Sequence, residues 1–469
     1  MTSPATTDWA MAVWRALGTD EESFDPVDPP TIIGPATVLP ATFDVTGFAA
    51  ATTATELLAA AQLLATRRAE TARPVTVSTR SAAAAFLAER LFTPLGWDLP
   101  PAWDPIAGDY RTQDGWIRLH TNYPHHRAVV HRVLGAATRE DVTRAVASWE
   151  GTALEDAIVS AGGCAAVMHT RAQWLGSAAG RSTRDEPLAR TDVGTPTGSA
   201  PRWVARSPVP VRPFDGVRVL DLTRVLAGPM CTRFLAAYGA DVLRIDPVGV
   251  DEVAALVPET TAGKHSTRLD LTCSPDRTTF AELVRTADVL VSGYRPGAFD
   301  ALGYDASALR SLNPELITAS LDAYGWTGPW RERRGFDSLV QMSVGIASAG
   351  ASEDGTDAPR PLPAQALDHG TGAVLAAAIG RALLRQLRHG APTSVRCSLI
   401  GTATALLGHP SPSGRTTPDP QWSDTDLVTT RTAWGSARQV PLPGEIAGTP
   451  PHWSVDAGPI GSHAPVWSS

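Results

Sequence analysis

Short apolar strands that alternate with helices constrain the fold of the C-terminal half most strongly. From about residue 212, helical segments separate apolar strand segments at 217–222, 241–246, 267–271, 288–294 and 316–325. Strands at this spacing with helices between them indicate a parallel sheet that helices cover on both faces. We therefore predict an α/β fold whose large domain is a Rossmann-like, doubly wound parallel sheet.

The turns after these strands are the expected ligand site, because doubly wound sheets bind ligands at the carboxyl ends of their strands. These turns fall at 224–229, 246–249, 293–297 and 322–325. The first turn reads TRVLAGP, with a single glycine in place of the GxGxxG fingerprint. A nicotinamide dinucleotide site is therefore a weak interpretation.

Charge and cysteine content narrow the class of protein. The net charge of −8 gives no broad basic surface for nucleic acid, although Arg331, Arg333 and Arg334 form a local cluster suited to an anion. The four cysteines are far apart and predict neither a metal site nor a disulfide framework. The first residues lack the order of a signal peptide, and we expect a cytoplasmic protein without a membrane span.

An internal repeat connects the two ends of the chain. Residues 41–86 and 364–407 both contain an aspartate, a Thr-Gly pair, an alanine-rich helix, a proline-containing turn, a short β run and a second alanine-rich helix. This echo predicts one structural unit that occurs twice. The copies differ at one point, because Asp44 lies two residues before its threonine, whereas Asp368 lies three before, and His369 has no counterpart.

A third unit lies between the copies. Residues 105–190 contain two strands joined by a Gln-Asp-Gly turn, then amphipathic helices and a further strand, which predicts a small α+β domain. Stretches rich in proline, threonine and arginine follow it and recur near residue 409. We predict these divisions: 1–104, a partial second copy of the catalytic-helix region; 105–190, the small domain; 191–211, a linker; 212–408, the large domain; 409–469, a linker and a segment that completes the large domain.

Ordered motifs in the large domain resemble the family III CoA-transferases. That superfamily includes formyl-CoA and carnitine CoA-transferases and 2-methylacyl-CoA racemases. The resemblance covers about 212–408 and rests on FDGVRVLDLTRVLAGPMCTRFLAAYGADVLRID (214–246), LVSGYRPGAFDALGYD (290–305), NPELITASLDAYGWTGPW (313–330), RRGFDSLVQMSVG (333–345) and ALDHGTG (366–372).

The small domain and the terminal segment also resemble the family, but in an unusual order. In ordinary members the small domain lies between the catalytic half of the large domain and the terminal segment, which 439–467 resembles here. In this chain the small domain comes first, behind the partial copy. We interpret the arrangement as a duplicated ancestor trimmed to something close to a circular permutation. The resemblance further implies an interlocked homodimer.

The resemblance implies that Asp368 is a nucleophile. Taken alone, Asp368 and His369 before an alanine-rich helix are typical of a helix cap, and only the ordered motifs around them favour catalysis. In the implied reaction the carboxylate attacks an acyl-CoA thioester and passes through an anhydride to an aspartyl-CoA thioester. We expect His369 to orient or cap, and Gly370 and Gly372 to let backbone donors approach.

The resemblance also implies residues that bind coenzyme A. It places Leu226 and Ala227 at a turn that touches the ligand, Leu269 and Tyr294 on the adenine side, and Arg295 at a phosphate. For Leu226 and Leu269, packing in the core is an equally good interpretation.

Two positions depart from the family pattern at the phosphates. Pro247 stands where some relatives carry arginine, and Asp322 where some carry lysine. Arg244, Lys264 and Arg295 are the residues that we expect to compensate for these departures.

We therefore predict a CoA-transferase that uses acyl-CoA and carboxylic acid substrates, with coenzyme A as substrate and neither a metal nor a permanently bound cofactor. A racemase is the first alternative, but its histidine falls in a GHD motif that reads GFD here, with Phe336 unable to carry a proton. We expect Asp337 to satisfy backbone donors. The second alternative is a non-catalytic CoA-binding paralogue or partner subunit.

Overall fold

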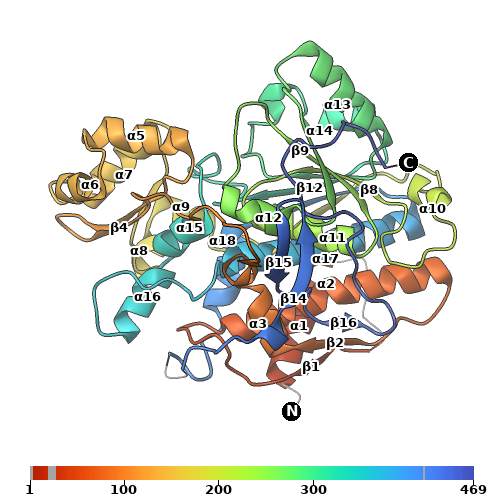
Figure 1. Cartoon of the computed structure of the whole chain (residues 1–469), viewed down its shortest axis with the longest axis horizontal. Coiled ribbons are helices and arrows are strands. Elements are labelled where there is room, and N and C mark those ends of the chain that lie inside the picture. Colours follow the sequence, from red (N-terminus) through yellow and green to blue (C-terminus); the bar gives the residue numbers. More distant parts are fainter. Residues whose placement is uncertain (1–3, 19–27, 416–417, 469) are drawn as a thin grey trace.

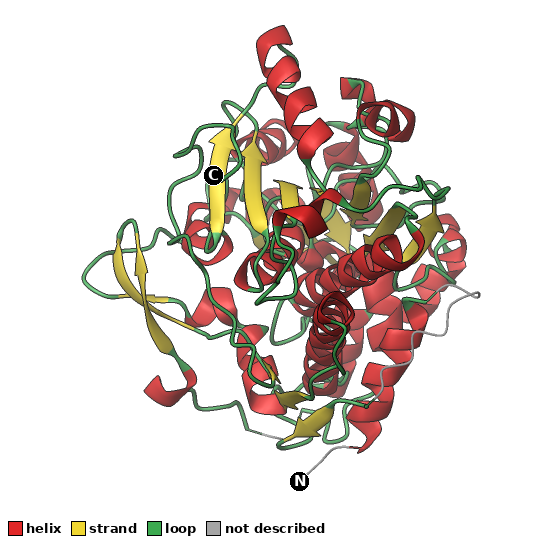
Figure 2. Cartoon of the chain, turned by 90° about the vertical axis from the view of Figure 1, so that its right-hand side faces the viewer, coloured by secondary structure: helices red, strands yellow, loops and turns green. Residues whose placement is uncertain are grey.

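A seven-stranded sheet forms the centre of the computed structural model, which describes residues 4–18, 28–415 and 418–468 (Figures 1 and 2). Its strand order is β10-β9-β8-β11-β12-β13-β7, and all neighbours are parallel except β7, which is antiparallel to β13. The strands are β7 (Arg190–Val193), β8 (Arg218–Leu222), β9 (Asp241–Asp246), β10 (Lys264–Arg268), β11 (Val289–Ser292), β12 (Ile317–Asp322) and β13 (Thr393–Ser398). The predicted α/β class with a large parallel sheet is confirmed.

Helices cover both faces of this sheet, because alternate side chains of each strand enter two separate apolar cores. Val219 of β8 and Val242 of β9 pack on the face covered by α11 and α17. Leu220 and Leu243 pack on the opposite face, which α13 and α14 cover. The four helices are α11 (Ala227–Ala237), α13 (Ser274–Thr286), α14 (Ala306–Leu312) and α17 (Ala366–His389).

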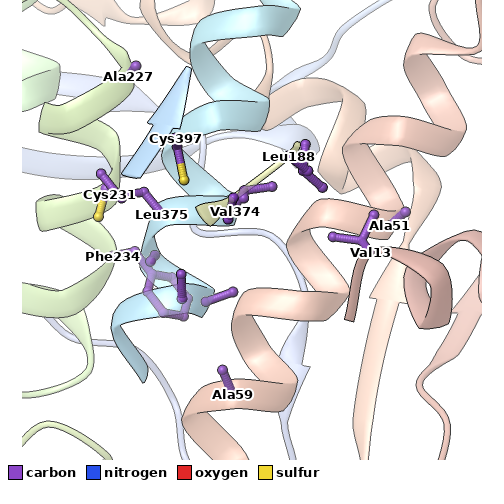
Figure 3. Close-up of a cluster of buried hydrophobic side chains, with 14 of the residues drawn as sticks. Val13, Ala51, Ala59, Leu188, Ala227, Cys231, Phe234, Val374, Leu375 and Cys397 are labelled. Carbon is purple, nitrogen blue, oxygen red and sulfur yellow. The ribbon is translucent and has the colours of Figure 1, made fainter. Parts of the chain in front are cut away.

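The helix α2 (Val45–Arg68) packs along α17, so that α17 lies between α2 and α11 (Figure 3). Of the described helices, only α2 is long and apolar enough, by length and composition, to span a bilayer. The whole apolar window of α2 is buried inside the protein, as in the core helix of a globular fold.

The two echoing segments have the same order of elements. The first unit is α2, β2 (Val75–Ser78) and α3 (Thr79–Ala85), and the second is α17, β13 and α18 (Leu399–Leu407). α2 and α17 each have 24 residues. Ser78 and Ser398 cap the second helix of each unit by accepting a hydrogen bond from the N–H three residues on.

The strands that flank the two units are exchanged between them. β7 follows the first unit and the 105–190 segment in sequence, yet it pairs with β13 of the second unit. β16 (Glu445–Ile446) follows the second unit and pairs with β2 of the first. The predicted linker at 191–211 therefore begins within a strand of the large sheet. The C-terminal segment adds β16 to the small sheet of the first unit.

The small α+β domain lies to one side of the large sheet (Figure 1, left). Its antiparallel sheet consists of β4 (Gly108–Arg111), β5 (Trp116–Leu119) and β6 (Ala165–Val167). The helices that cover the sheet are α5 (Pro124–Leu134), α6 (Arg139–Val146) and α7 (Gly151–Ser160). Cys164 and Ala166 form an apolar contact with Leu339 of α15 (Asp337–Val344), which joins this domain to the large one.

The remaining elements are shorter, apart from α1 (Pro4–Ala16), which packs against α2. They are β1 (Thr31–Ile33), α4 (Ala88–Leu91), β3 (Thr93–Pro94), α8 (Arg171–Gly176), α9 (Ala178–Ser182), α10 (Arg202–Arg206), η1 (Ala254–Leu256), α12 (Val257–Thr260), η2 (Asp300–Leu302), α16 (Ile346–Glu353), η3 (Asp424–Asp426), β14 (Val428–Thr432) and β15 (Gly435–Gln439).

Candidate active site

A cavity of about 450 Å³ lies at the carboxyl ends of β8, β9, β11 and β12, where the sequence predicts ligand binding. The small domain closes one side of it, and α17 presents Asp368 to it. Its lining residues are Tyr123, His125, His126, Leu222, Thr223, Arg224, Val225, Ala227, Ile245, Pro247, Val250, Gly293, Tyr294, Arg295, Ala298, Leu321, Asp322, Ala323, Arg333, Arg334, Gly335, Phe336, Asp368 and Leu399.

Asp368 does not cap the helix that it begins. It is the third residue of α17, whose N-cap position is Gln365. Its side chain is 6% exposed and lines the cavity, and no described residue donates a hydrogen bond to its carboxylate. The carboxylate is therefore held in the cavity without a fixed hydrogen-bond partner, which the capping interpretation does not explain.

Asp337 performs the capping role instead. Its Oδ2 accepts hydrogen bonds from the backbone N–H groups of Leu367, at 2.8 Å, and of Asp368, at 3.1 Å. The Gln341 amide donates to its other oxygen. These are two of the N–H groups at the start of α17 that have no partner within the helix. The structure thus gives Asp337 the backbone contacts that the GFD motif suggests.

Burial and neighbouring carboxylates disfavour ionisation of Asp368. Burial raises the pKa of Asp368 well above its ordinary value, and the negative charges of Asp337 and Glu89 raise it further. Burial also raises the pKa of Asp337, to about 6, despite the hydrogen bonds from Gln341 and the backbone. The cavity therefore keeps a proton near Asp368 at a pH at which an exposed aspartate has lost it.

His369 is held by a residue of the N-terminal segment. Its Nε2 lies 3.0 Å from Oε2 of Glu89, and both side chains are buried. The ring stacks on Phe86 with a centroid separation of 5.3 Å. Burial disfavours ionisation of Glu89. The charge of His369 and the hydrogen bond between the two side chains outweigh this effect and hold the pKa of Glu89 below its ordinary value.

Gly370 and Gly372 pack helices rather than present backbone donors. Both lie inside α17, which runs unbroken, so their N–H groups bond to the preceding turn of the helix. A Cβ atom at Gly370 would lie 2.2 Å from the Phe48 ring of α2, and one at Gly372 would lie 2.5 Å from the carbonyl oxygen of Ala227. They allow α17 to approach α2 and α11 closely.

The structure brings some of the predicted binding residues to the cavity and leaves others in the core. Ala227, Tyr294 and Arg295 line the cavity. Leu226 and Leu269 are buried, and Leu269 packs in the core beneath α13, as the alternative interpretation of these leucines holds.

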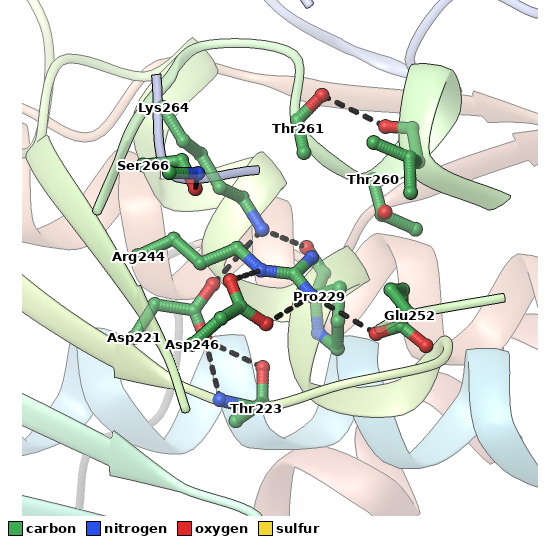
Figure 4. A network of polar contacts seen from close by, with 12 residues as sticks. Asp221, Thr223, Pro229, Arg244, Asp246, Glu252, Thr260, Thr261, Lys264 and Ser266 are labelled. Carbon is green, nitrogen blue, oxygen red and sulfur yellow. Dashed lines mark hydrogen bonds and ion pairs between the residues drawn. The ribbon is translucent and has the colours of Figure 1, made fainter. Parts of the chain in front are cut away.

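Arg244 and Lys264 do not reach the cavity, because buried carboxylates hold both (Figure 4). Arg244 forms ion pairs with Asp246, at 2.8 Å, and with Glu252, at 2.9 Å. Lys264 Nζ lies 3.0 Å from Asp221 Oδ2, and burial lowers the pKa of Lys264 to about 8 although Asp221 opposes this shift. These two cations therefore stabilise the fold beside the site rather than compensate for Pro247 and Asp322.

This buried network supports the cavity wall. Glu252 accepts hydrogen bonds from the backbone N–H of Val225, at 2.9 Å, and from the Tyr123 hydroxyl of the small domain, at 2.9 Å. Val225 has a φ of 68°, which is costly for a β-branched residue. Glu252 and Arg244 therefore hold a strained turn and the small domain together at one edge of the cavity.

Three arginines make the cavity electropositive. The guanidinium groups of Arg224 and Arg334 form no hydrogen bond or ion pair with any described residue, and Arg295 donates to the carbonyl oxygen of Glu332. Arg333, by contrast, is paired with Glu155 at 2.8 Å. Free guanidinium groups at a cavity edge suit a phosphorylated or carboxylated ligand.

The small domain adds residues that the sequence did not single out. His126 lines the cavity, and burial with the positive charges around it lowers its pKa to about 3, so its ring is neutral. Phe336 stacks face to face on His120, with centroids 3.7 Å apart. No local pattern identifies His126, because its position depends on how 105–190 docks on α15.

Asp322, at the end of β12, also lines the cavity, and burial raises its pKa to about 8.

Part of the chain is similar to known CoA-transferases. A family described as CoA-transferase family III matches residues 214–426. The chain is 34% identical over 210 residues to "Probable fatty acyl-CoA transferase Rv3272" of Mycobacterium tuberculosis, covering 42% of this chain and 53% of the relative. It is 35% identical over 212 residues to acetyl-CoA:oxalate CoA-transferase of Acetobacter aceti, covering 43% and 54%. The chain thus spans about half the length of these relatives.

Two further comparisons complete these findings. Succinate–glutarate CoA-transferase of Agrobacterium fabrum is 33% identical over 215 residues, covering 42% of this chain and 53% of the relative. A crystal structure of Rv3272 is 34% identical with a TM-score of 0.39, covering 42% of this chain and 58% of that one.

Proposed function

We propose that this chain, whose residues 214–426 match CoA-transferase family III, moves coenzyme A from an acyl-CoA thioester to a carboxylic acid, with Asp368 as nucleophile. The observation that carries the proposal is the Asp368 carboxylate, which lies in the cavity without a hydrogen-bond partner among the described residues. Asp337 already satisfies the helix start, so Asp368 is left for chemistry.

The proposed reaction has four exchanges. An Asp368 oxygen attacks the thioester carbon, the C–S bond breaks, and an acyl-aspartyl anhydride forms. The released thiolate attacks the aspartyl carbonyl, which gives aspartyl-CoA and frees the first acid. The acceptor carboxylate then attacks aspartyl-CoA to form a second anhydride, and the thiolate attacks its acyl carbonyl, which restores Asp368. No net proton is consumed.

The strand order supports nucleotide binding at this cavity. Numbered from β8 to β13, the parallel strands are arranged 3-2-1-4-5-6, the Rossmann-like order, which reverses direction between β8 and β11. Arg224 follows β8 and Arg295 follows β11, so both stand at the reversal. We assign the phosphates of coenzyme A to Arg224, Arg295 and Arg334, and the adenine to the side of Tyr294.

Two observations favour transfer over racemisation. Phe336, at the position of the racemase histidine, is apolar and stacked on His120. Asp337 is committed to two backbone N–H groups and to Gln341, so it does not replace that base. A non-catalytic protein that binds coenzyme A is distinguished from a transferase only by whether acyl-CoA modifies Asp368. The homodimer implied by the resemblance and the cytoplasmic location expected from the sequence stay predictions.

Covalent trapping tests the proposal. The protein is incubated with a panel of short, branched and steroid-like acyl-CoAs, treated with hydroxylamine or borohydride, and digested for peptide mass spectrometry. The proposal expects modification at Asp368 in the wild type and none in Asp368→Asn. Binding of coenzyme A without modification of Asp368 by any acyl-CoA would instead favour a racemase or a non-catalytic binding protein.

A further inference from the structure

Glu89, which follows the first repeat unit in sequence, contacts the start of the helix that carries Asp368. It lies on α4, just after α3, and its side chain is 4% exposed. Its Oε2 lies 3.0 Å from His369 Nε2, and the Gln365 amide nitrogen lies 3.5 Å from its Oε1. Gln365 and His369 stand on either side of Asp368 in sequence, so one carboxylate contacts both ends of the first turn of α17.

Burying a carboxylate costs free energy unless a specific partner offsets the lost hydration. Glu89 has that partner in His369, whose ring Phe86 fixes from its other face. Phe86 and Glu89 lie three residues apart, at and just after the end of the first unit, and far in sequence from His369. This segment therefore builds part of the wall behind Asp368.

The charge of Glu89 also raises the pKa of Asp368, after the larger effects of burial and of Asp337. Asp337 of α15 adds a second negative charge, and the pair of Arg233 on α11 and Glu259 on α12 lies behind them with a separation of 2.8 Å. The charged and titratable groups on the cavity side, besides Asp368, are Arg224, Arg295, Arg333, Arg334, Asp322, His125, His126, Tyr123 and Tyr294.

We propose that Glu89 is a positioning residue for Asp368: through His369 and Gln365 it fixes the first turn of α17 and the surroundings in which the Asp368 carboxylate ionises. The inference rests on the proposed function. The segment that follows the first repeat unit thus supports the helix that carries Asp368.

The test measures the ionisation of Asp368 without turnover. Asp368 is labelled with a water-soluble carbodiimide and glycinamide across a pH series, and its peptide is quantified by mass spectrometry in the wild type, Glu89→Gln and Glu89→Met. Both variants remove the charge at similar volume, so each serves if the other fails to fold. We expect the midpoint of labelling to move to lower pH, by about one unit, because a neighbouring like charge disfavours the ionised carboxylate.

The control is Asp44→Asn, which removes a carboxylate of the first repeat unit. Asp44 caps α2, where it accepts a hydrogen bond from the Gly47 N–H at 2.7 Å. Its midpoint should match the wild type. An unchanged midpoint in both folded Glu89 variants would overturn the inference. Failure of acyl-CoA to modify wild-type Asp368 would reject the transferase proposal, and a shifted midpoint would still stand as evidence for the role of Glu89.

Discussion

The Asp337 carboxylate accepts the backbone N–H of Asp368 at 3.1 Å, so one aspartate caps the helix from which the other faces the cavity. Both carboxyl groups are buried, and after burial itself the charge of Asp337 disfavours ionisation of Asp368. Each aspartate therefore has a separate role. Substituting one or the other should change the stability of the protein in different ways.

Replacing Asp368 by asparagine should stabilise the protein while it abolishes transfer. The pKa of Asp368 is raised in the folded state, so its ionisation opposes folding, and the cost grows as pH rises from the unfolded pKa to the folded one. Thermal melts of Asp368→Asn should match the wild type near pH 4 and exceed it at pH 8. A melting temperature below that of the wild type at pH 8 would contradict this electrostatic account.

Replacing Asp337 by alanine should destabilise the protein by about 1–2 kcal/mol, the usual cost of losing a helix cap. Asp337→Asn keeps one acceptor oxygen and should lose less. Urea unfolding at pH 7 measures the difference. Equal stability of the alanine and asparagine variants would show that the cap bonds to Leu367 and Asp368 contribute little.

Removing the positive charge of Arg224 or Arg334 should weaken acyl-CoA binding. Hydrogen bonds to charged groups contribute about 1.5–3 kcal/mol, so Arg224→Gln and Arg334→Gln should each raise KM at least roughly tenfold. Arg331→Gln is the matched control, because Arg331 is exposed and pairs with its neighbour Glu332. If the control raises KM as much as the cavity variants, the phosphate assignment fails.

Glu252→Gln should weaken the cavity wall. It removes the charge that Arg244 pairs with, and breaking a buried ion pair costs about 3–5 kcal/mol. It also weakens the bonds to the Val225 N–H and the Tyr123 hydroxyl, so KM should rise together with the loss of stability. Denaturant unfolding and steady-state kinetics on the same sample check both effects.

Gly370→Ala should destabilise the contact between α2 and α17, because its Cβ would overlap the Phe48 ring. Overpacking of a core costs about 1–3 kcal/mol. Phe48→Leu should recover part of this loss in the double variant, and Gly115→Ala, where a Cβ meets nothing within 4 Å, is the control. Additive effects of the two substitutions would refute direct contact between these positions.

The sequence predicts the parallel sheet well because β8, β9, β11 and β12 are runs of apolar residues. It places β10 three residues too late, since Lys264–Arg268 is polar and is buried through ion pairs rather than apolar packing. It assigns part of β7 to a linker because Arg190–Val193 is a short polar edge strand.

Some residues of the candidate site can be predicted from local sequence motifs, and others cannot. Asp368, Ala227, Tyr294 and Arg295 lie in local motifs at strand ends or at helix starts, and the structure brings all four to one cavity. Glu89 and His126 come from segments whose docking is a tertiary property, and no local pattern marks them. A glycine in sequence also does not distinguish a backbone donor from a helix contact, which is why the role of Gly370 was predicted wrongly.

Transfer of oxygen from the acceptor acid to Asp368 tests the central claim most directly. The protein turns over an acyl-CoA with an acceptor acid whose carboxylate carries ¹⁸O, and the peptide that contains Asp368 is then weighed. Attack of the acceptor on aspartyl-CoA leaves one acceptor oxygen on Asp368, so the account predicts ¹⁸O in that side chain after turnover. Product formation with only ¹⁶O at Asp368 would contradict the account.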